Sequence, residues 1–327
     1  MGYAPIDRLY ALVEADMLAT DRLIHDRMGS TVALIPELTS HLVDSGGKRL
    51  RPLLTLAASS ACGYGGKHQI KLAAAVEFVH TATLLHDDVV DASTLRRGKL
   101  AANIVWGNKP SVLVGDFLLS RAFQLMVETG NMQVLHILAS ASAIIAEGEV
   151  LQLKSANNLT TTQEDYLTIV RAKTAALFSA AAEVGATIAN AGDEHIGAFR
   201  TYGLNLGIAF QLIDDTLDYS GHQAQMGKSV GDDFREAKVT LPVILAYQRA
   251  DKEAQQFWER TIQGGPQQES DLKQAIAYVE KTGAILDARA EAHRYARQAG
   301  RALKLLPPGE LRDVLAALAA FCVSRAY

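Results

Sequence analysis

The stretch LLHDDVVDASTLRRG, residues 84–98, places three aspartates within five residues and two arginines just beyond them. The apolar residues that precede the aspartates predict a buried helix, where clustered like charges are costly because they repel each other. A second group with the same D-D-x-x-D spacing, DDTLD, occupies residues 214–218 and also follows an apolar stretch. The repetition predicts two helices that each present a carboxylate cluster to a cation.

Helical spacing explains why these carboxylates would act together. Residues i and i+4 share one face of a helix, so Asp87 lies above Asp91, and Asp214 lies above Asp218. Oxygen-only clusters suit hard divalent ions, and Mg²⁺ commonly binds one or two carboxylates together with phosphate oxygens. The alternative, two solvated acidic helix ends, is disfavoured because acids prefer helix N-termini. The predicted metal ligands are Asp87, Asp88, Asp91, Asp214, Asp215 and Asp218.

Basic and amide side chains surround both motifs in the sequence and could bind a metal-bound diphosphate. Arginine matches a diphosphate with two parallel hydrogen bonds, whereas lysine acts as a point charge. Each of these residues alone could be a solvated surface group or, for His80, a packing residue; their positions near the acidic motifs favour binding. The candidates are Lys48, Arg49, Arg51, His80, Arg96, Arg97, Lys173, Thr174, Gln211, Lys228 and Lys238.

The rest of the chain reads as helical. No proline lies between Pro110 and Pro242, and alternating strand patterns are nearly absent. Hydrophobic residues make up 49% of the 327 residues, which is enough for a sizeable core. The predicted helices span 7–27, 31–44, 50–62, 68–92, 110–128, 132–154, 163–190, 194–220, 240–262, 268–281, 284–304 and 308–325. We expect one all-α domain, residues 1–327, because no break resembles a flexible linker.

Composition excludes several classes of function. The formal net charge of −4 provides no basic field for nucleic acid. Two cysteines suit neither a disulfide framework nor a zinc site, so a reducing cytoplasm is expected. We expect no signal peptide, and the most apolar region, 175–191, is too short for a membrane span and carries Glu183.

The ordered motifs GGKRLRP, LLHDDVVDASTLRRG, AKT, FQLIDDTLDY and GDDFREAKVTLP resemble those of the trans-polyprenyl (E-isoprenyl) diphosphate synthases over nearly the whole chain. The resemblance implies an all-α homodimer of the isoprenoid synthase type. Its single-domain bundle of long helices would surround a deep central cavity, with both aspartate motifs at the mouth. It also implies two or three Mg²⁺ ions per site. One departure is visible, because the family commonly has glycine before the last lysine and this chain has Ala237.

The resemblance also implies a role for each matching residue. Catalysis is assigned to Asp87, Asp88, Asp91, Asp214 and Lys173, and the six aspartates would hold Mg²⁺ against the allylic diphosphate. The residues that would bind the allylic diphosphate are Arg96, Lys173, Thr174, Gln211, Lys228 and Lys238. Those that would bind isopentenyl diphosphate are Lys48, Arg51, His80 and Arg97. The allylic C–O bond would ionise, and isopentenyl diphosphate would then add to the cation and lose a proton.

Product length is expected to depend on the helix before the first aspartates. Bulky side chains one turn upstream block short-chain members of the family, whereas this chain has Ala82 and Thr83 there and Val79 a further turn down. Phe123, Met126 and Leu138 are candidates for the floor of the tunnel, although each could equally be ordinary core packing. We therefore expect a product of about C40–C50 that serves as a quinone side chain and enters the membrane.

There are three alternatives. The first is a shorter-chain synthase making C15–C20 products; some shorter-chain relatives carry a two-residue insertion in the first aspartate motif, which this chain lacks. A terpene cyclase would usually carry an Asn/Asp, Ser/Thr, Glu pattern at its second metal site, and it would not need GGKRLRP or Arg97. A non-catalytic synthase subunit would be expected to lose aspartates, and both motifs here are complete.

Overall fold

The computed structural model describes residues 4–43, 47–96, 98–220 and 231–324. The described chain is almost entirely helical, which confirms the all-α prediction. It divides into two compact units. Unit 1 contains Met1–Ser142, Leu177–Gly203 and Arg301–Leu318, and unit 2 contains Ala143–Ala176, Leu204–Gly300 and Ala319–Tyr327. The prediction of one domain over residues 1–327 stays a prediction.

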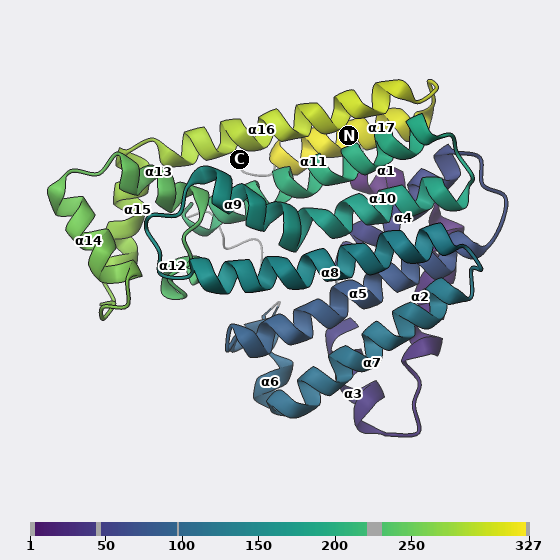
Figure 1. Ribbon diagram of the computed structural model, residues 1–327, viewed down its shortest axis with the longest axis horizontal. Coiled ribbons are helices and arrows are strands. Elements are labelled where there is room, and N and C mark those ends of the chain that lie inside the picture. Colours follow the sequence, from purple (N-terminus) through teal and green to yellow (C-terminus); the bar gives the residue numbers. More distant parts are fainter. Residues whose placement is uncertain (1–3, 44–46, 97, 221–230, 325–327) are drawn as a thin grey trace. The chain divides into compact units, whose positions relative to one another are not determined.

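Helices account for nearly all of the regular structure (Figure 1). They are α1 (Pro5–Leu12), α2 (Glu14–Met28), α3 (Leu34–Val43), α4 (Leu50–Ala61), α5 (His68–Val90), α6 (Ala102–Val105), α7 (Asn108–Val127), α8 (Met132–Ser155), α9 (Gln163–Val170), α10 (Ala176–Ile188), α11 (Asp193–Asp218), α12 (Asp232–Arg235), α13 (Leu241–Gln248), α14 (Lys252–Ile262), α15 (Asp271–Lys281), α16 (Ala284–Ala302) and α17 (Glu310–Ser324). A π-helical turn, Arg171–Ala175, joins α9 to α10, and a 3₁₀ turn, Leu303–Leu305, follows α16.

The structure differs from the predicted elements in several places. The segment 7–27 is two helices, because Val13 leaves the helical conformation between α1 and α2. The segment 240–262 is also two helices, and Asp251 begins the second by accepting a hydrogen bond from the Ala254 amide at 3.0 Å. After the first aspartates the chain forms a small antiparallel hairpin, β1 (Leu95–Arg96) and β2 (Lys99–Leu100), which the sequence pattern did not predict.

Helix α5 forms the centre of unit 1 and ends at the first aspartate motif. Most of its residues before that motif are buried, and it packs against α2, α4 and, most extensively, α7 (Figure 1). Helices α4 and α10 also approach closely, because a Cβ on Gly185 would lie 2.3 Å from the Thr55 carbonyl oxygen. The Thr55 hydroxyl donates to the Ala181 carbonyl at 2.8 Å across the same contact. This packing fixes α5, and with it the first motif.

Unit 2 has an apolar core with an aromatic cluster at α14. The rings of Phe234, Phe257, Trp258 and Tyr278 contact one another with centroid separations of 5.2–6.5 Å. Trp258 is fully buried, and Leu212 and Ile213 of α11 belong to the same core. The apolar residues before the second aspartate motif are therefore anchored in a core, as those of the first motif are in unit 1.

Helices α7 and α8 carry large apolar side chains on their exposed faces. Both are long and apolar enough to cross a membrane by length and composition, with mean hydropathies of 1.2 and 1.6 over 18 residues. Core helices pass the same test, and each of these helices buries one face at helical spacing, for example through Val114 and Leu118 of α7 and Val134 and Leu138 of α8. The exposed apolar residues are Val112, Leu113, Phe123 and Val127 on α7 and Met132, Ile144, Val150, Leu151 and Leu153 on α8.

Candidate active site

The first aspartate motif lies at the C-terminal end of α5 in unit 1. Asp87 and Asp88 are in the last turn and Asp91 is the C-cap, whose amide donates to the Asp87 carbonyl at 2.8 Å. A helix C-terminus carries partial negative charge, so three carboxylates there need cationic partners. The motif thus lies at the end of the helix predicted over residues 68–92.

Asp88 is fully buried and pairs with Arg96 of β1. Arg96 donates from Nε to Asp88 Oδ1 at 2.9 Å and also from Nη2. Burial raises the pKa of Asp88, and the Arg96 contact opposes that shift. Within the described part of the chain Asp88 Oδ2 has no hydrogen-bond partner. A buried carboxylate oxygen without a donor is the kind of atom that a cation could satisfy.

The loop after Asp88 is held by Asn103 of α6. Its amide nitrogen donates to the carbonyls of Asp88 and Ser93 at 3.0 and 3.1 Å. The hairpin of β1 and β2 then places Arg96 next to Asp88 of the first aspartate motif, which precedes it in the chain. The structure thus places Arg96 beside the first aspartates, whereas Arg97 lies outside the described residues.

The GGKRLRP segment leads into α4, where Arg51 and His80 lie together. Arg51 Nη1 is 3.2 Å from His80 Nε2, which must accept this bond because a guanidinium carries only donors. The Arg51 guanidinium also lies over the Phe178 ring, 4.3 Å from its centre. Lys48 is exposed just before them. The structure therefore brings together two of the residues predicted to bind isopentenyl diphosphate.

Arg49 forms ion pairs with two other helices. Its φ of 42° is in the left-handed region. Its guanidinium reaches Asp21 of α2 at 3.0 Å and Glu77 of α5 at 3.1 Å. Arg49 therefore links α4 to two other helices, and sequence reasoning had grouped it only with the basic candidates.

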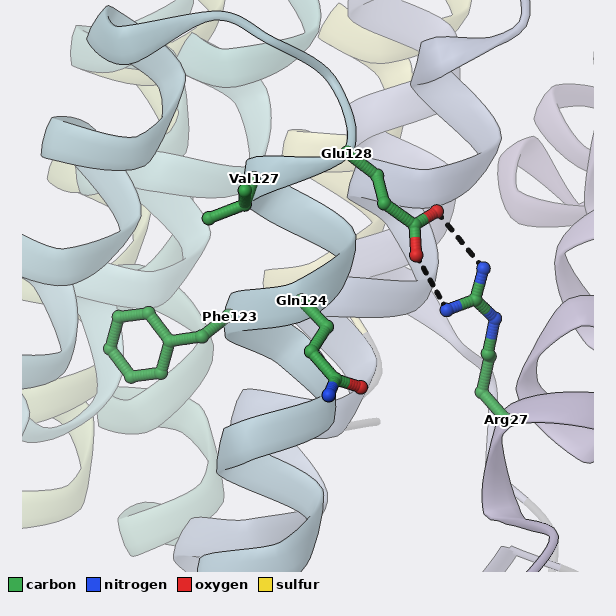
Figure 2. A pocket seen from close by; sticks show the side chains of 5 residues that line it. All are labelled: Arg27, Phe123, Gln124, Val127 and Glu128. Atoms are coloured by element: carbon green, nitrogen blue, oxygen red, sulfur yellow. Dashed lines mark hydrogen bonds and ion pairs between the residues drawn. The ribbon is translucent and has the colours of Figure 1, made fainter.

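The predicted chain-length residues lie along α5. Val79 and Ala82 are buried, and the half-buried Thr83 donates to the His80 carbonyl at 2.8 Å. Of the floor candidates, Met126 and Leu138 are buried, whereas Phe123 is at the surface. Phe123 lines a pocket of about 550 Å³ with Arg27, Gln124, Val127 and Glu128. Figure 2 shows its ring directed away from the paired Arg27 and Glu128.

The second aspartate motif lies at the end of α11 in unit 2, and its members differ in environment. Asp214 is half-buried, whereas Asp215 and Asp218 are buried. The Asp218 carboxylate accepts from the backbone amides of Asp232 and Asp233 at 3.2 and 3.0 Å, at the start of α12. Burial, together with the carboxylates of Asp215 and Asp218, raises the pKa of Asp233 well above its usual range. The two hydrogen bonds from the amides of Asp232 and Asp233 mean that the Asp218 carboxylate also caps the short helix α12.

The Asp215 carboxylate accepts hydrogen bonds from Tyr166 and Gln211. The Tyr166 hydroxyl donates to Oδ2 at 2.5 Å, and Gln211 Nε2 donates to Oδ1 at 2.7 Å. The Gln211 carbonyl oxygen in turn accepts from the Thr174 hydroxyl at 2.9 Å. Burial, and next the Asp215 charge, raises the pKa of Tyr166 well above its usual range. Thr174 and Gln211 were predicted together, whereas Tyr166 was missed because a tyrosine in an apolar helix resembles a core residue.

Lys173 and Thr174 belong to the π-helical turn between α9 and α10. Such turns interrupt the regular helical ladder and frequently occur at functional sites. Lys173 forms an ion pair with Glu149 of α8. The neighbouring Gly148 meets the same turn, since a Cβ there would lie 2.9 Å from the Lys173 amide nitrogen. The sequence predicted one continuous helix here, so both Glu149 and Gly148 were missed.

The last predicted lysines fall in or after a gap. Lys228 lies outside the described residues. Lys238 forms an ion pair with Glu236 at 2.5 Å. The preceding Ala237 has a φ of 53°, in the left-handed region that favours glycine. Ala237 therefore replaces the glycine that is common in the family at a position where glycine would fit the backbone without strain.

The carboxylates do not form a ready-made metal cage. Among the described residues no three His, Cys, Asp or Glu side chains gather closely enough to hold an ion. The donors nevertheless fit a hard divalent cation, because the ones available are carboxylate oxygens and Asp88 Oδ2 is buried without a hydrogen-bond donor. In each unit a carboxylate motif is accompanied by cationic or amide donors.

Comparisons with known proteins agree over nearly the full length. The family model described as polyprenyl synthetase matches residues 32–279. The octaprenyl diphosphate synthase of Escherichia coli is 41% identical over 320 residues, which are 98% of this chain and 99% of that protein. A crystal structure of a polyprenyl synthase from Caulobacter crescentus, complexed with calcium and isoprenyl diphosphate, matches with a TM-score of 0.96 and 54% identity over 98% of both chains. A decaprenyl diphosphate synthase from Rhodobacter capsulatus matches with a TM-score of 0.94 and 54% identity over 98% of this chain and 99% of that one.

Proposed function

Since the chain belongs to the polyprenyl synthetase family and is a long-chain trans-prenyl diphosphate synthase, we propose that it extends an allylic diphosphate with isopentenyl diphosphate to about C40–C50. The observation that carries this proposal is the pairing of each acidic motif with diphosphate-binding side chains. Asp88 is accompanied by Arg96 in unit 1, and Asp215 by Gln211 and Thr174 in unit 2. Such pairs suit a substrate that is a metal-bound diphosphate.

The two substrates are assigned to different groups of side chains. Arg51 and His80, with Lys48 and Arg97, bind isopentenyl diphosphate; the contact between Arg51 and His80 supports this assignment. Arg96, Lys173, Thr174, Gln211, Lys228 and Lys238 bind the allylic diphosphate. The adjacency of Lys173 and Thr174 in one π-helical turn supports placing them on one substrate. Arg97 and Lys228 are proposed from the resemblance alone.

We propose two or three Mg²⁺ ions per site as the cofactor. The residues that would hold them are Asp87, Asp88, Asp91, Asp214, Asp215 and Asp218, and the buried Asp88 Oδ2 without a hydrogen-bond donor among the described residues supports this assignment. When bound, Mg²⁺ would neutralise charge on the departing diphosphate. The related structure from Caulobacter crescentus is complexed with calcium, another divalent ion that prefers oxygen ligands.

The reaction needs no side-chain nucleophile. Cationic side chains stabilise the diphosphate as the allylic C–O bond breaks, and its electron pair leaves with the diphosphate. The double bond of isopentenyl diphosphate then forms the new C–C bond to the allylic cation. A proton leaves the adjacent carbon, with the departed diphosphate as its acceptor, and a new trans double bond results. The exclusion of water by the apolar residues before each motif protects the cation.

The assignment of a long product to this chain's own residues rests on α5. Ala82 and Val79 are buried and small, so they leave room for a growing tail. A C40–C50 chain suits a quinone side chain, and it would partition into a bilayer because each buried CH₂ contributes about 0.8 kcal/mol. The proposed location of the enzyme is the cytoplasm, from which the product enters the membrane.

The experiment is incorporation of labelled isopentenyl diphosphate by the purified protein with Mg²⁺ and geranyl or farnesyl diphosphate. Chromatography of the dephosphorylated products should show C40–C50 alcohols. Asp87→Asn should lower the rate by about a hundredfold or more if the carboxylate stabilises the departing group. Products of C15–C20 would contradict the proposed length, and the absence of incorporation by the protein alone would favour a non-catalytic subunit.

We also propose that the protein is a homodimer in which the exposed apolar faces of α7 and α8 form the contact. Leu113 and Val127 of α7 are 67% and 62% exposed, and Met132 and Val150 of α8 are 75% and 66% exposed. Large apolar side chains that are this exposed support a partner surface on these helices. Light scattering should give twice the mass of one chain, and Leu113→Glu with Val127→Glu should give one. A wild-type monomer would contradict this part of the proposal.

A further inference from the structure

Tyr166 of α9 has no role in the reaction described above, yet it is bonded to the second aspartate motif. Its side chain is 5% exposed, and its hydroxyl donates to Asp215 Oδ2 at 2.5 Å. Buried hydroxyl groups usually have a hydrogen-bond partner. Here the partner is not a backbone carbonyl but a carboxylate of the second aspartate motif. The contact joins α9, which precedes the π-helical turn, to α11, which carries the motif.

The contact continues through two further hydrogen bonds. Asp215 Oδ1 accepts from Gln211 Nε2 at 2.7 Å, and Gln211 Oε1 accepts from the Thr174 hydroxyl at 2.9 Å. An ionised carboxylate can only accept, so the amide nitrogen of Gln211 must point to Asp215 and its carbonyl oxygen to Thr174. The orientation of one amide therefore decides which way the Thr174 hydroxyl points.

We propose that Tyr166 is a positioning residue that acts through Asp215 to fix the Gln211 amide and the Thr174 hydroxyl for the allylic substrate. This inference rests on the proposed function, because Gln211 and Thr174 are assigned there to the allylic diphosphate. Tyr166 restrains one carboxylate oxygen, which leaves the other oriented toward Gln211. Without the phenol this restraint on the carboxylate is lost, and the Gln211 amide is held less firmly in its orientation.

A purely structural role for Tyr166 predicts a different outcome. If the phenol only stabilises the fold, its removal lowers the melting temperature and affects both substrates alike. If it positions Gln211 and Thr174, the loss appears in the kinetics of the allylic substrate and depends on Gln211. Isopentenyl diphosphate, assigned to Arg51 and His80 in unit 1, should be affected little.

The test is Tyr166→Phe in the full-length protein, with steady-state rates measured against each substrate in turn at saturating Mg²⁺. We expect kcat/KM for the allylic substrate to fall about tenfold, the effect of one lost hydrogen bond to a charged group. We expect KM for isopentenyl diphosphate to change less than twofold. The double variant Tyr166→Phe/Gln211→Ala should be no slower than Gln211→Ala alone, because residues of one network are not additive.

Tyr202→Phe is the matched control. Tyr202 is also buried, and its hydroxyl donates to the Leu315 carbonyl at 2.8 Å within unit 1. The same atom is removed from a buried hydrogen bond that contains no site residue. We expect this variant to melt at a lower temperature than the wild type and to keep both kinetic constants.

Two results would overturn the inference. The first applies if the wild type is active: Tyr166→Phe has the same kinetic constants as the wild type, or its kcat/KM is reduced equally for both substrates. The other concerns stability and does not depend on turnover: additive losses of unfolding free energy in Tyr166→Phe, Gln211→Ala and the double variant would show that the two residues are not coupled. An inactive wild type with non-additive stability losses would count against the proposed function and support the coupling of Tyr166 to Gln211.

Discussion

Gly148 of α8 lies directly against the backbone of Lys173: a Cβ on Gly148 would be 2.9 Å from the Lys173 amide nitrogen and 2.8 Å from the Ala172 Cβ. Contacts that short cannot be accommodated without movement of the π-helical turn that carries Lys173 and Thr174. The absence of one methyl group on α8 therefore permits the observed position of two predicted substrate-binding residues.

Gly148→Ala should reduce both stability and turnover. Overpacking of this kind typically costs about 1–3 kcal/mol of unfolding free energy. Gly300→Ala in α16 is the control, because beyond its chain neighbours and its own helix backbone no atom lies within 4 Å of its Cβ position, and helical alanine is favoured over glycine by about 1 kcal/mol. Denaturant unfolding and the allylic KM measure both effects. A Gly148→Ala variant as stable and as active as Gly300→Ala would contradict the close contact.

Ala237→Gly should stabilise the protein slightly. Ala237 has a φ of 53°, which costs an L-residue roughly 1–2 kcal/mol, and the entropy of glycine offsets part of the gain. We expect an increase of up to about 1 kcal/mol in unfolding free energy. Asn190→Gly, at a φ of 52°, should gain less because asparagine tolerates this conformation. If Asn190→Gly raised the unfolding free energy as much as Ala237→Gly or more, backbone strain at Ala237 would not be the cause of the gain.

Two substitutions of Arg49 separate the energetic cost of its left-handed backbone from the contribution of its ion pairs. Arg49→Ala removes the contacts to Asp21 and Glu77 and keeps the left-handed backbone, so it should cost about 2 kcal/mol of unfolding free energy. Arg49→Gly removes the same contacts but relieves the backbone, and should cost about 1 kcal/mol less. Chemical denaturation of both variants measures the difference. If glycine were the more damaging substitution, the assigned backbone conformation would be wrong.

Ala82→Phe should shorten the product. Ala82 is buried on α5 one turn before the aspartates, so a phenyl ring there would occupy space needed by a tail. We expect products of about C15–C20, separated by chromatography after dephosphorylation. Ala82→Ser, which adds a single oxygen, should leave the length unchanged. An unchanged distribution in Ala82→Phe would mean that the tail does not pass this residue.

Stability should fall at low pH partly through Glu128. Hydrogen bonds from Arg27 and then Lys71 lower the pKa of Glu128 to about 2, below its unfolded value of about 4.3. The contribution is therefore fully present above pH 5 and is lost as the pH falls through 4 toward 2. With one third of the Glu128 side chain exposed, we expect about 1 kcal/mol. Glu128→Gln should flatten the pH dependence of urea unfolding between pH 6 and 3; an unchanged slope would remove Glu128 as a cause.

Local sequence patterns predicted the all-α fold and the places of both acidic motifs. Spacing alone puts Asp87 and Asp91 on one face of a helix, because helical periodicity depends only on neighbouring residues. The contact between Arg51 and His80 joins two helices, and here the family resemblance supplied what periodicity does not contain. The hairpin that returns Arg96 to Asp88 was not predicted, since two-residue strands leave no alternating pattern.

The residues that were missed depend on contacts between distant segments. Tyr166 and Asp215 are 49 residues apart, and nothing in the α9 sequence distinguishes Tyr166 from a core tyrosine. Gly148 resembles any helical glycine until the π-helical turn is placed beside it. The residues around Arg49 in the sequence do not indicate that its backbone is left-handed. By contrast, the departure from glycine at Ala237 was visible in the sequence, and its physical meaning became clear only from the backbone angle.

The Arg96–Asp88 contact has a consequence for how the chain reaches its folded state. The two residues are eight positions apart, so closing the loop between them costs little entropy, and the contact can form early in folding. The cluster of like charges at the end of α5 then carries an internal counter-ion before the more distant segments assemble. A newly made chain would therefore not depend on a metal ion to bury Asp88.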